Sequence, residues 1–494
     1  MRRLGTVIAI LVFGVAGIAG AQARQTRPLD RANLDTTCAP CTNFYQFANG
    51  GWLAHNPIPA AYSQWGSFNE LADRNTANLH TVLDEAAAKR GSAGDASVRK
   101  LGTFYAACMD TAAIERAGMT PIASDLAEIR AIASTADVQR YVIAQQAAGH
   151  GVLFRFGSAP DAKRSSEVIG SLAQGGLGLP DRDYYLKDDA RTAALRTSYV
   201  QHVANDLALV GVPRAQADSD ARHVLALESA LAQAHLTRVQ QRDPELTYNR
   251  KTPAELAELA PGFDWKALLA ADNASGTTAI NVSNPKFVAA MDSLLRTVPV
   301  SDWRSYFTWH LVRRAAPTLS AAFVNEDFAF AQKLSGAKAQ LPRYKKCIAA
   351  TDNAMGEALG KAYVERFFTP QAKARAVQMV NNLKAAFRER LASRAWMSDS
   401  TRTMAYAKLD AFLQQIGYPD TWKDYSALTL PPKGSYYANE GAVARFDNAD
   451  AISRIGKPLD RGRWTMSPPT VNAYYSAQLN KIVFPAGILQ PPFF

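Results

Sequence analysis

Apolar residues at helical spacing recur along most of this 494-residue chain, and they restrict it to a mainly α-helical fold. Val98, Leu101, Phe104 and Cys108 share one stripe, which predicts that Cys108 is buried on a helix. The sequence contains no internal repeat at the periods of solenoid proteins. We therefore expect a large multi-helical domain rather than a repeat array.

Two further helices are expected between residues 369 and 417. Thr369 is a good N-cap and Pro370 suits the first helical position, so a long helix should begin there. Its inward face is expected to carry Ala376, Val380, Leu383, Phe387 and Leu391. The next helix should begin near Ser398 and stop at Gly417. It is expected to bury Leu409, Phe412, Leu413 and Ile416.

Two regions have the composition of strands. Residues 152–156 and 168–172 are apolar and flank a polar turn region, which predicts a small β-hairpin. Residues 471–475 and 481–484 flank a second polar turn and are also expected to be strands. The segment 431–434 is rich in proline and glycine and predicts a linker ahead of the second pair.

The N-terminus has the pattern of an export signal. Arg2 and Arg3 precede an uncharged apolar run, and residues 21–23 supply the small-x-small pattern of a signal-peptidase site. The run is short for a membrane-spanning helix, which needs about 20 apolar residues. We interpret residues 1–23 as a cleaved signal peptide and expect a periplasmic or extracellular protein. An uncleaved membrane anchor is the alternative, and only then would a membrane be a partner.

The charge pattern does not favour nucleic acid as a partner. The formal net charge is +11, but the basic residues are scattered, and residues 343–346 form the only notable cluster. A nucleic-acid site would need a basic face interleaved with stacking aromatic residues. We interpret the charge as a solvated basic surface.

The four cysteines are candidates for disulfides because the chain is expected to be exported. Cys38 and Cys41 form a C-x-x-C motif, whereas Cys108 and Cys347 are far apart in the sequence. Two disulfides, one local and one long-range, are therefore preferred. A zinc site needs about four nitrogen or sulfur ligands, and no second C-x-x-C motif completes one here.

A search for other catalytic motifs finds none. No two of the seven histidines lie four residues apart, so the H-E-x-x-H zinc motif is missing, as is the G-x-S-x-G elbow. The 44 Asp and Glu residues offer no reason to prefer one acid–base pair over another. We therefore predict no catalytic and no metal-binding residue within this sequence.

Eight blocks of sequence, in a fixed order, carry a family resemblance. They are residues 41–52, 56–59, 65–68, 104–110, 177–185, 416–419, 471–475 and 484–494. The last two blocks together are the strongest match, and the final one, Phe484–Phe494, reads FPAGILQPPFF. Together the blocks resemble the neprilysin and endothelin-converting-enzyme family of zinc metallopeptidases, and the resemblance extends from Cys38 to the end of the sequence.

The resemblance implies a fold and a division into segments. The signal peptide at 1–23, expected from the N-terminal pattern, is followed by an N-terminal linker at 24–40. From there the resemblance implies a helical domain at 41–428, and at 429–494 a linker with the first strands of a thermolysin-like α+β catalytic domain. In this family the H-E-x-x-H helix and the third zinc ligand follow the last matching block. We therefore expect a sequence truncated before them, with zinc in the complete family member and none bound to this chain.

The resemblance also implies roles for particular residues. By family position, Asn472 and Ala473 belong to the edge strand that hydrogen-bonds an extended substrate backbone; an ordinary edge strand is the alternative. Cys108 and Cys347 match a family pair that forms a disulfide. Cys41 matches another family cysteine, but Cys38 is close enough in sequence to pair with it locally.

The expected function is that of an exported zinc metalloendopeptidase that hydrolyses short peptides on the amino side of hydrophobic residues. As written, the chain is expected to be inactive because the zinc-binding part is missing. The alternatives are an exported peptide-binding protein without catalysis and a decayed truncated product. Short peptides are the expected partners, and the missing catalytic half is a further candidate.

Overall fold

The computed structural model describes residues 30–91, 94–431 and 434–494, which belong to two compact units. The first unit comprises the residues up to His55 together with Pro491–Phe494, and the second comprises Asn56–Gln490. The predicted signal peptide lies outside the described residues. Within the described ranges, none of the helices combines the length and the apolar character needed to cross a membrane.

The first unit is built around helix α1 (Phe44–His55) and the short 3-10 helix η1 (Arg31–Asn33). The two segments approach closely at Gly51, where an added Cβ would lie 2.2 Å from the carbonyl oxygen of Ala32. A hydrogen bond of 2.9 Å from the side-chain amide of Gln46, on α1, to the carboxylate of Asp35 joins α1 to the segment just after η1.

Cys38 and Cys41 are free thiols, so the predicted local disulfide is wrong. The Cys38 sulfur lies 3.6 Å from the carbonyl oxygen of Asn43 instead. Cys41 is exposed on the turn that the Thr42 N–H closes onto the carbonyl of Ala39. The hydrogen bonds of the turn therefore decide where the two thiols lie, despite their proximity in sequence.

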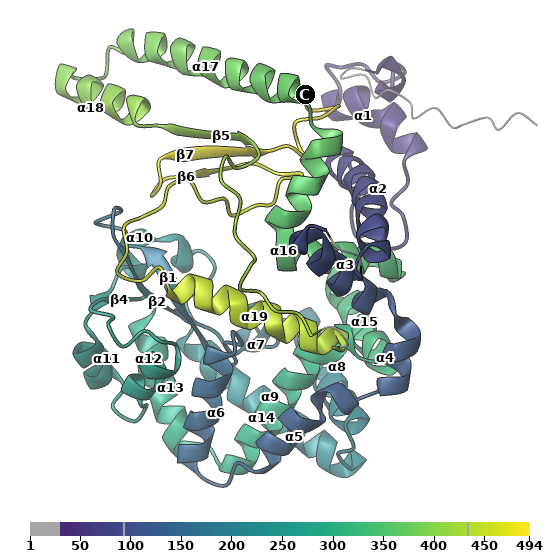
Figure 1. Ribbon diagram of the computed structural model, residues 1–494, viewed down its shortest axis with the longest axis vertical. Helices are drawn as coiled ribbons and strands as arrows, with labels where there is room; N and C mark the ends of the chain where they lie inside the picture. Colours follow the sequence, from purple (N-terminus) through teal and green to yellow (C-terminus); the bar gives the residue numbers. More distant parts are fainter. Residues whose placement is uncertain (1–29, 92–93, 432–433) are drawn as a thin grey trace, which may run out of the picture. The chain divides into compact units, whose positions relative to one another are not determined.

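In the described residues of the second unit, helices come before and between seven strands (Figure 1). Those up to the middle of the unit are α2 (Ser67–Ala88), α3 (Ala96–Met109), α4 (Thr111–Ala117), η2 (Thr120–Ile122), α5 (Ala123–Arg130), α6 (Thr135–Ala147), α7 (Asp183–Leu186), α8 (Ala190–Leu209), α9 (Arg214–Ala234), η3 (Gln240–Arg242) and α10 (Pro244–Thr247). The later ones are α11 (Pro253–Leu259), α12 (Trp265–Ala271), α13 (Pro285–Thr297), α14 (Val300–Ala315), η4 (Ala316–Thr318), α15 (Ala321–Ser335), α16 (Arg343–Phe367), α17 (Pro370–Ala392), α18 (Asp399–Asp410) and α19 (Tyr436–Ile452). The predicted mainly helical fold with small sheets is confirmed.

One sheet has the strand order β1-β2-β4-β3, formed by β1 (Phe154–Pro160), β2 (Val168–Gln174), β3 (Arg250–Lys251) and β4 (Ile280–Val282). Strands β1 and β2 pair antiparallel, which confirms the predicted hairpin. Strand β4 joins β2 in parallel, a pairing between segments that lie far apart in sequence.

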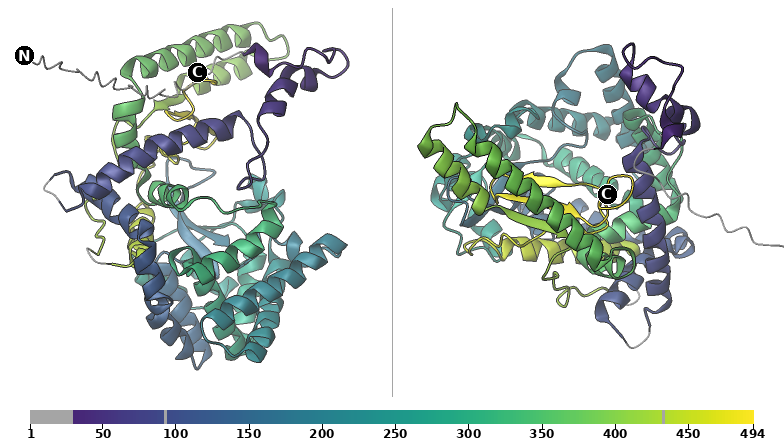
Figure 2. Two further views of the ribbon diagram at one scale, coloured as in Figure 1. Left: turned by 90° about the vertical axis from the view of Figure 1, so that its right-hand side faces the viewer. Right: turned by 90° about the horizontal axis from the view of Figure 1, so that it is seen from above.

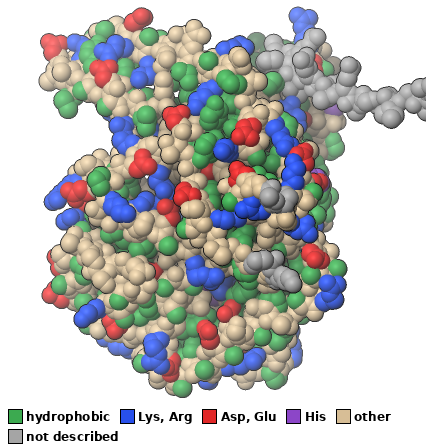
Figure 3. Space-filling model, viewed as in Figure 1, with side chains coloured by type: hydrophobic (Ala, Val, Ile, Leu, Met, Phe, Trp, Pro, Cys, Tyr) green, Lys and Arg blue, Asp and Glu red, His purple; other side chains and the backbone are tan. Residues whose placement is uncertain are grey.

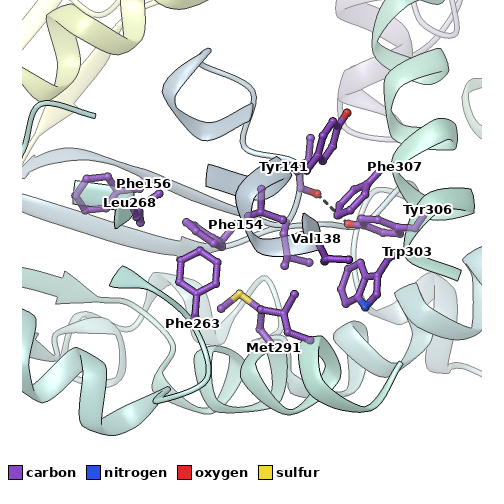
Figure 4. Packing of buried hydrophobic residues seen from close by; sticks show 14 of the residues in the cluster. Val138, Tyr141, Phe154, Phe156, Phe263, Leu268, Met291, Trp303, Tyr306 and Phe307 are labelled. Atoms are coloured by element: carbon purple, nitrogen blue, oxygen red, sulfur yellow. Dashed lines mark hydrogen bonds between the residues drawn. The ribbon is translucent and has the colours of Figure 1, made fainter. Parts of the chain in front are cut away.

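A large apolar core lies between this sheet and the surrounding helices (Figure 4). Phe154 of β1 packs edge-on against Phe263, with 5.6 Å between the ring centroids. The hydroxyl of Tyr306, on α14, is buried and donates a hydrogen bond of 2.8 Å to the carbonyl of Val152. Burial of side chains of this size contributes about 1.5–3 kcal/mol each, so this core is the main source of stability for the helical part.

The second sheet has the order β5-β7-β6 and lies beneath α17 and α18 (Figures 1 and 2). Strand β5 (Leu413–Gly417) runs parallel to β7 (Lys481–Pro485), and β6 (Tyr474–Ser476) pairs antiparallel with β7. The two strands predicted near residues 471–475 and 481–484 are therefore confirmed, with shifted ends.

Two expectations about residues 369–417 are wrong. The second helix ends at Asp410, and Leu413–Gly417 is a strand, because these residues pair with β7 about 70 residues later. Leu383 and Phe387 do not face the core, since their side chains are 62% and 53% exposed. The start of the first helix is as predicted, because the Thr369 side chain accepts the N–H of Ala372.

Helices α3 and α16 are joined by a disulfide between Cys108 and Cys347. The sulfur atoms are 2.01 Å apart, and the bridge links residues 239 positions apart in the sequence. Both cysteines are buried, as the helical stripe predicted for Cys108. This bridge matches the pairing that the family resemblance implied.

Candidate peptide-binding edge strand

Strand β6 forms one edge of its three-stranded sheet within the part of the chain that the structure describes. Asn472 and Ala473 directly precede it, and Asn472 is exposed. The side-chain oxygen of Asn472 accepts a hydrogen bond of 2.8 Å from the N–H of Ala473. That N–H is therefore satisfied by its neighbour, and Asn472 would have to turn away before a peptide could use it.

A buried lysine anchors the neighbouring strand. Lys481 begins β7, is fully buried, and donates hydrogen bonds to the carbonyls of Arg461, at 3.1 Å, and Arg463. Burial lowers the pKa of Lys481 to about 8. Because its ammonium group is bound to backbone carbonyls, we assign it a structural role in fixing β7.

The loop before β6 rests on helix α16. The hydroxyl of Ser467 donates a hydrogen bond of 2.9 Å to the Asp352 carboxylate. Burial raises the pKa of Asp352 to about 6, although the bond from Ser467 opposes this. The loop also packs on Gly360, where an added Cβ would lie 2.4 Å from Pro468. The helical part of the unit therefore determines where the chain enters the edge strand.

An apolar groove of about 490 Å³ lies between the α17–α18 helix pair and the sheet. Its lining includes Leu383, Phe387, Leu409, Tyr475, Ile482 and Phe484. The ring of Tyr475, from β6, stacks on Phe412 at a centroid distance of 6.2 Å. This groove explains why Leu383 and Phe387 are apolar although they do not face the core.

Among the described residues, no group of three or more His, Cys, Asp or Glu side chains could hold a metal ion. Two histidines lie against carboxylates: the ring of the buried His202 is 3.1 Å from Glu326, and the ring of the partly buried His310 is 2.9 Å from Glu228. Burial lowers the pKa of both rings.

Residues 177–185, a block of the family resemblance, form part of a buried polar cluster around Glu228. The hydroxyls of Tyr185 and Tyr199 each donate a hydrogen bond of 2.7 Å to its carboxylate. The backbone N–H of Leu179 donates to the same Tyr185 hydroxyl at 2.7 Å. No local sequence pattern predicts this cluster, because its members come from elements far apart in the chain.

The surface charges agree with the scattered distribution in the sequence. On the face seen in Figure 3, Lys and Arg side chains are interspersed with Asp and Glu side chains. Among the described residues, exposed side chains form ion pairs, such as that between Arg366 and Glu85 at 2.8 Å.

The fold and the order of the sequence blocks define a class of protein, the zinc metallopeptidases related to neprilysin and endothelin-converting enzyme. Residues 40–419 match the family model for peptidase family M13. The chain belongs to peptidase family M13.

Curated relatives support this assignment. The chain is 32% identical over 489 residues to human endothelin-converting enzyme 1 and 28% identical over 494 residues to neprilysin-3 of Drosophila melanogaster. Each alignment covers 94% of this chain and 62% of the relative, so the chain spans less than two thirds of their length.

Solved structures give the same result. The crystal structure of the Mycobacterium tuberculosis zinc metalloprotease Zmp1 in complex with an inhibitor aligns with a TM-score of 0.88 and 35% identity, covering 95% of this chain and 71% of that one. PepO from Lactobacillus rhamnosis aligns with a TM-score of 0.84 at 20% identity, covering 94% of this chain and 72% of that one, and supports the fold alone.

Proposed function

We propose that this polypeptide is the substrate-admitting part of an exported zinc metalloendopeptidase that acts on short peptides before hydrophobic residues. In this proposal β6, together with Asn472 and Ala473, pairs with the extended backbone of the peptide. The observation that carries it is the free edge of β6 among the described residues, on a strand whose entry is fixed by buried contacts.

Pairing with β6 requires hydrogen bonds from particular N–H groups of the peptide. Successive N–H groups of an extended chain point in opposite directions, so only every second one can bond to the edge strand. N-methylation of a short peptide, one position at a time, should therefore weaken binding at alternate positions only. Fluorescence polarisation with the 494-residue polypeptide measures the affinity for each N-methylated peptide. Equal effects at all positions would contradict pairing with β6.

We further propose that residues 1–494 alone bind no stoichiometric zinc and do not hydrolyse peptides. The support is that the sequence contains no H-E-x-x-H motif and that the described residues contain no metal-binding cluster. Elemental analysis after dialysis should find well below one zinc per chain. About one tightly held zinc per chain, with hydrolysis of short peptides, would overturn this.

A zinc-binding segment, in the same chain or supplied separately, is a proposed partner. The apolar groove beside α17 is the face we propose for its contact, because exposed apolar side chains such as Leu383 and Phe387 are a liability in water unless covered. Nucleic acid is not proposed as a partner.

We also propose export, with cleavage after residue 23. The N-terminal pattern supports this, and a buried disulfide is typical of oxidising compartments. N-terminal sequencing of protein from the periplasmic or extracellular fraction should begin at residue 24. A membrane-bound protein that retains Arg2 and Arg3 would favour the uncleaved anchor.

A further inference from the structure

We infer that Asn75 is the positioning residue of the proposed substrate strand, an inference that rests on the proposed function of β6. Asn75 lies on α2, is 2% exposed, and is nearly 400 residues from the strand in sequence. Its carboxamide bonds both to backbone that enters β6 and to backbone that leaves β7.

The amide nitrogen of Asn75 bridges two segments. It donates hydrogen bonds of 3.2 Å to the carbonyl of Pro469 and 3.1 Å to the carbonyl of Gly487. Pro469 lies three residues before Asn472, and Gly487 lies two residues after the end of β7. The Asn75 carboxamide therefore sets the spacing between the segment that enters β6 and the segment that leaves β7. This junction lies at the open end of the β6–β7 pair, near Asn472.

The oxygen of the same carboxamide is also bound. It accepts hydrogen bonds from the hydroxyl of Tyr363, at 2.9 Å, and from the Gln490 amide, at 3.4 Å. Gln490 also donates to the Tyr363 hydroxyl. With both donors and both acceptor positions of Asn75 engaged, its side chain has a single orientation available.

Close backbone packing makes this junction intolerant of displacement. The N–H of Gly487 donates a hydrogen bond of 2.7 Å to the carbonyl of Pro468, and an added Cβ on Gly487 would lie 2.1 Å from the carbonyl oxygen of Pro469. If the donors of Asn75 were removed, the buried carbonyls of Pro469 and Gly487 would each lose a partner at the point where the two segments touch. The first response should be local opening of residues 467–476.

The substitution Asn75→Asp removes both donors with little change in volume and puts carboxylate oxygens against the two carbonyls. We expect amide hydrogen exchange in residues 471–476 to accelerate at least tenfold, the effect of leaving one buried polar group unsatisfied. Peptide binding should weaken at least tenfold. Exchange in the β1–β2 hairpin should not change.

Asn284→Asp is the matched control. Asn284 is 3% exposed and likewise donates twice, to the Gln174 side chain and the Ala234 carbonyl, each at 2.8 Å, but it lies beside the other sheet. This variant should accelerate exchange near residues 174 and 234 and leave residues 471–476 unchanged. It therefore separates positioning of the edge strand from general loss of stability.

Tyr363→Phe is the conservative second variant and keeps the test decisive if Asn75→Asp does not fold. It removes the bond to the Asn75 oxygen and the bond that the Tyr363 hydroxyl accepts from Gln490, and it leaves both bonds donated by Asn75 in place. We expect a smaller acceleration in residues 471–476, about threefold to tenfold, and peptide binding weakened to a similar degree.

The measurements are hydrogen exchange read by mass spectrometry and peptide binding, both on the 494-residue polypeptide. Unchanged exchange in residues 471–476 in the folded variants, or equal acceleration there in Asn284→Asp, would overturn the inference. If the expected exchange pattern appears but the unsubstituted polypeptide binds no peptide, the proposed function fails and the fixing of the strand by Asn75 stands.

Discussion

Replacing Gly178 with alanine should strongly destabilise the helical part of the protein. Gly178 belongs to the block at residues 177–185 and packs directly on the buried cluster around Glu228. An added Cβ would lie 1.9 Å from the hydroxyl oxygen of Tyr199, 2.9 Å from its Cζ atom, and 3.1 Å from a carboxylate oxygen of Glu228. The phenol ring must therefore move.

The size of the destabilisation follows from the hydrogen bonds of Tyr199 that this movement breaks. The Tyr199 hydroxyl donates to Glu228 at 2.7 Å and accepts from the Trp309 indole at 2.9 Å, and all three side chains are buried. Overpacking a core costs about 1–3 kcal/mol. Loss of a hydrogen bond to a buried charged group costs about 1.5–3 kcal/mol more. We therefore expect the free energy of unfolding to fall by about 3–5 kcal/mol.

Urea denaturation followed by tryptophan fluorescence measures this change. Gly157→Ala is the matched control, because an added Cβ there meets nothing within 4 Å, and it should change stability by less than about 0.5 kcal/mol. In a Tyr199→Phe background, Gly178→Ala should cost less than it does alone, because the closest contact is gone. If Gly178→Ala were as mild as the control, the steric argument would be refuted.

Two further predictions concern the disulfide and a buried carboxyl group. Replacing both Cys108 and Cys347 with serine should lower the free energy of unfolding by up to about 5 kcal/mol, because the bridge spans 239 residues; an unchanged urea midpoint would contradict this. Burial, assisted by Glu326, raises the pKa of Asp206 to about 8. The folded protein therefore holds a proton that the unfolded chain releases near pH 4, so this group's contribution to stability should fall as pH rises from about 4 to about 8. Asp206→Asn should remove that slope and raise stability at pH 9 in thermal melts, and parallel pH profiles for variant and parent would refute the assignment.

Local sequence signals predicted much of the fold. The helical stripe that carries Cys108, the N-cap at Thr369, the β1–β2 hairpin and the two late strands all depend on neighbouring residues. These signals come from side-chain periodicity and from capping of the first helical N–H groups. Both act between residues that are close in sequence.

The errors arose where distant segments decide the structure. Residues 413–417 continue a helical pattern, but pairing with β7 makes them a strand. Leu383 and Phe387 fit an inward stripe, yet they line the groove beside the sheet. An apolar stripe shows that a face avoids water, but not which surface lies against it.

The candidate site could be predicted only in part. The resemblance assigned Asn472 and Ala473 to the edge strand itself, whereas in the structure they directly precede it. Their role in peptide binding stays a prediction. No sequence feature identified Asn75 as important, because a lone asparagine within a helical pattern usually faces solvent. Its importance depends on two carbonyl groups, at Pro469 and Gly487, that only the folded chain brings to it.

The bonds of Asn75 also have a consequence for biosynthesis. Its partners lie 394 and 412 positions later in the chain. At translation rates of about 5–20 residues per second, α2 leaves the ribosome roughly 20–80 seconds before those partners exist. Throughout that interval the junction cannot close, so the region around Asn75 must stay open until residues 469–487 have been made.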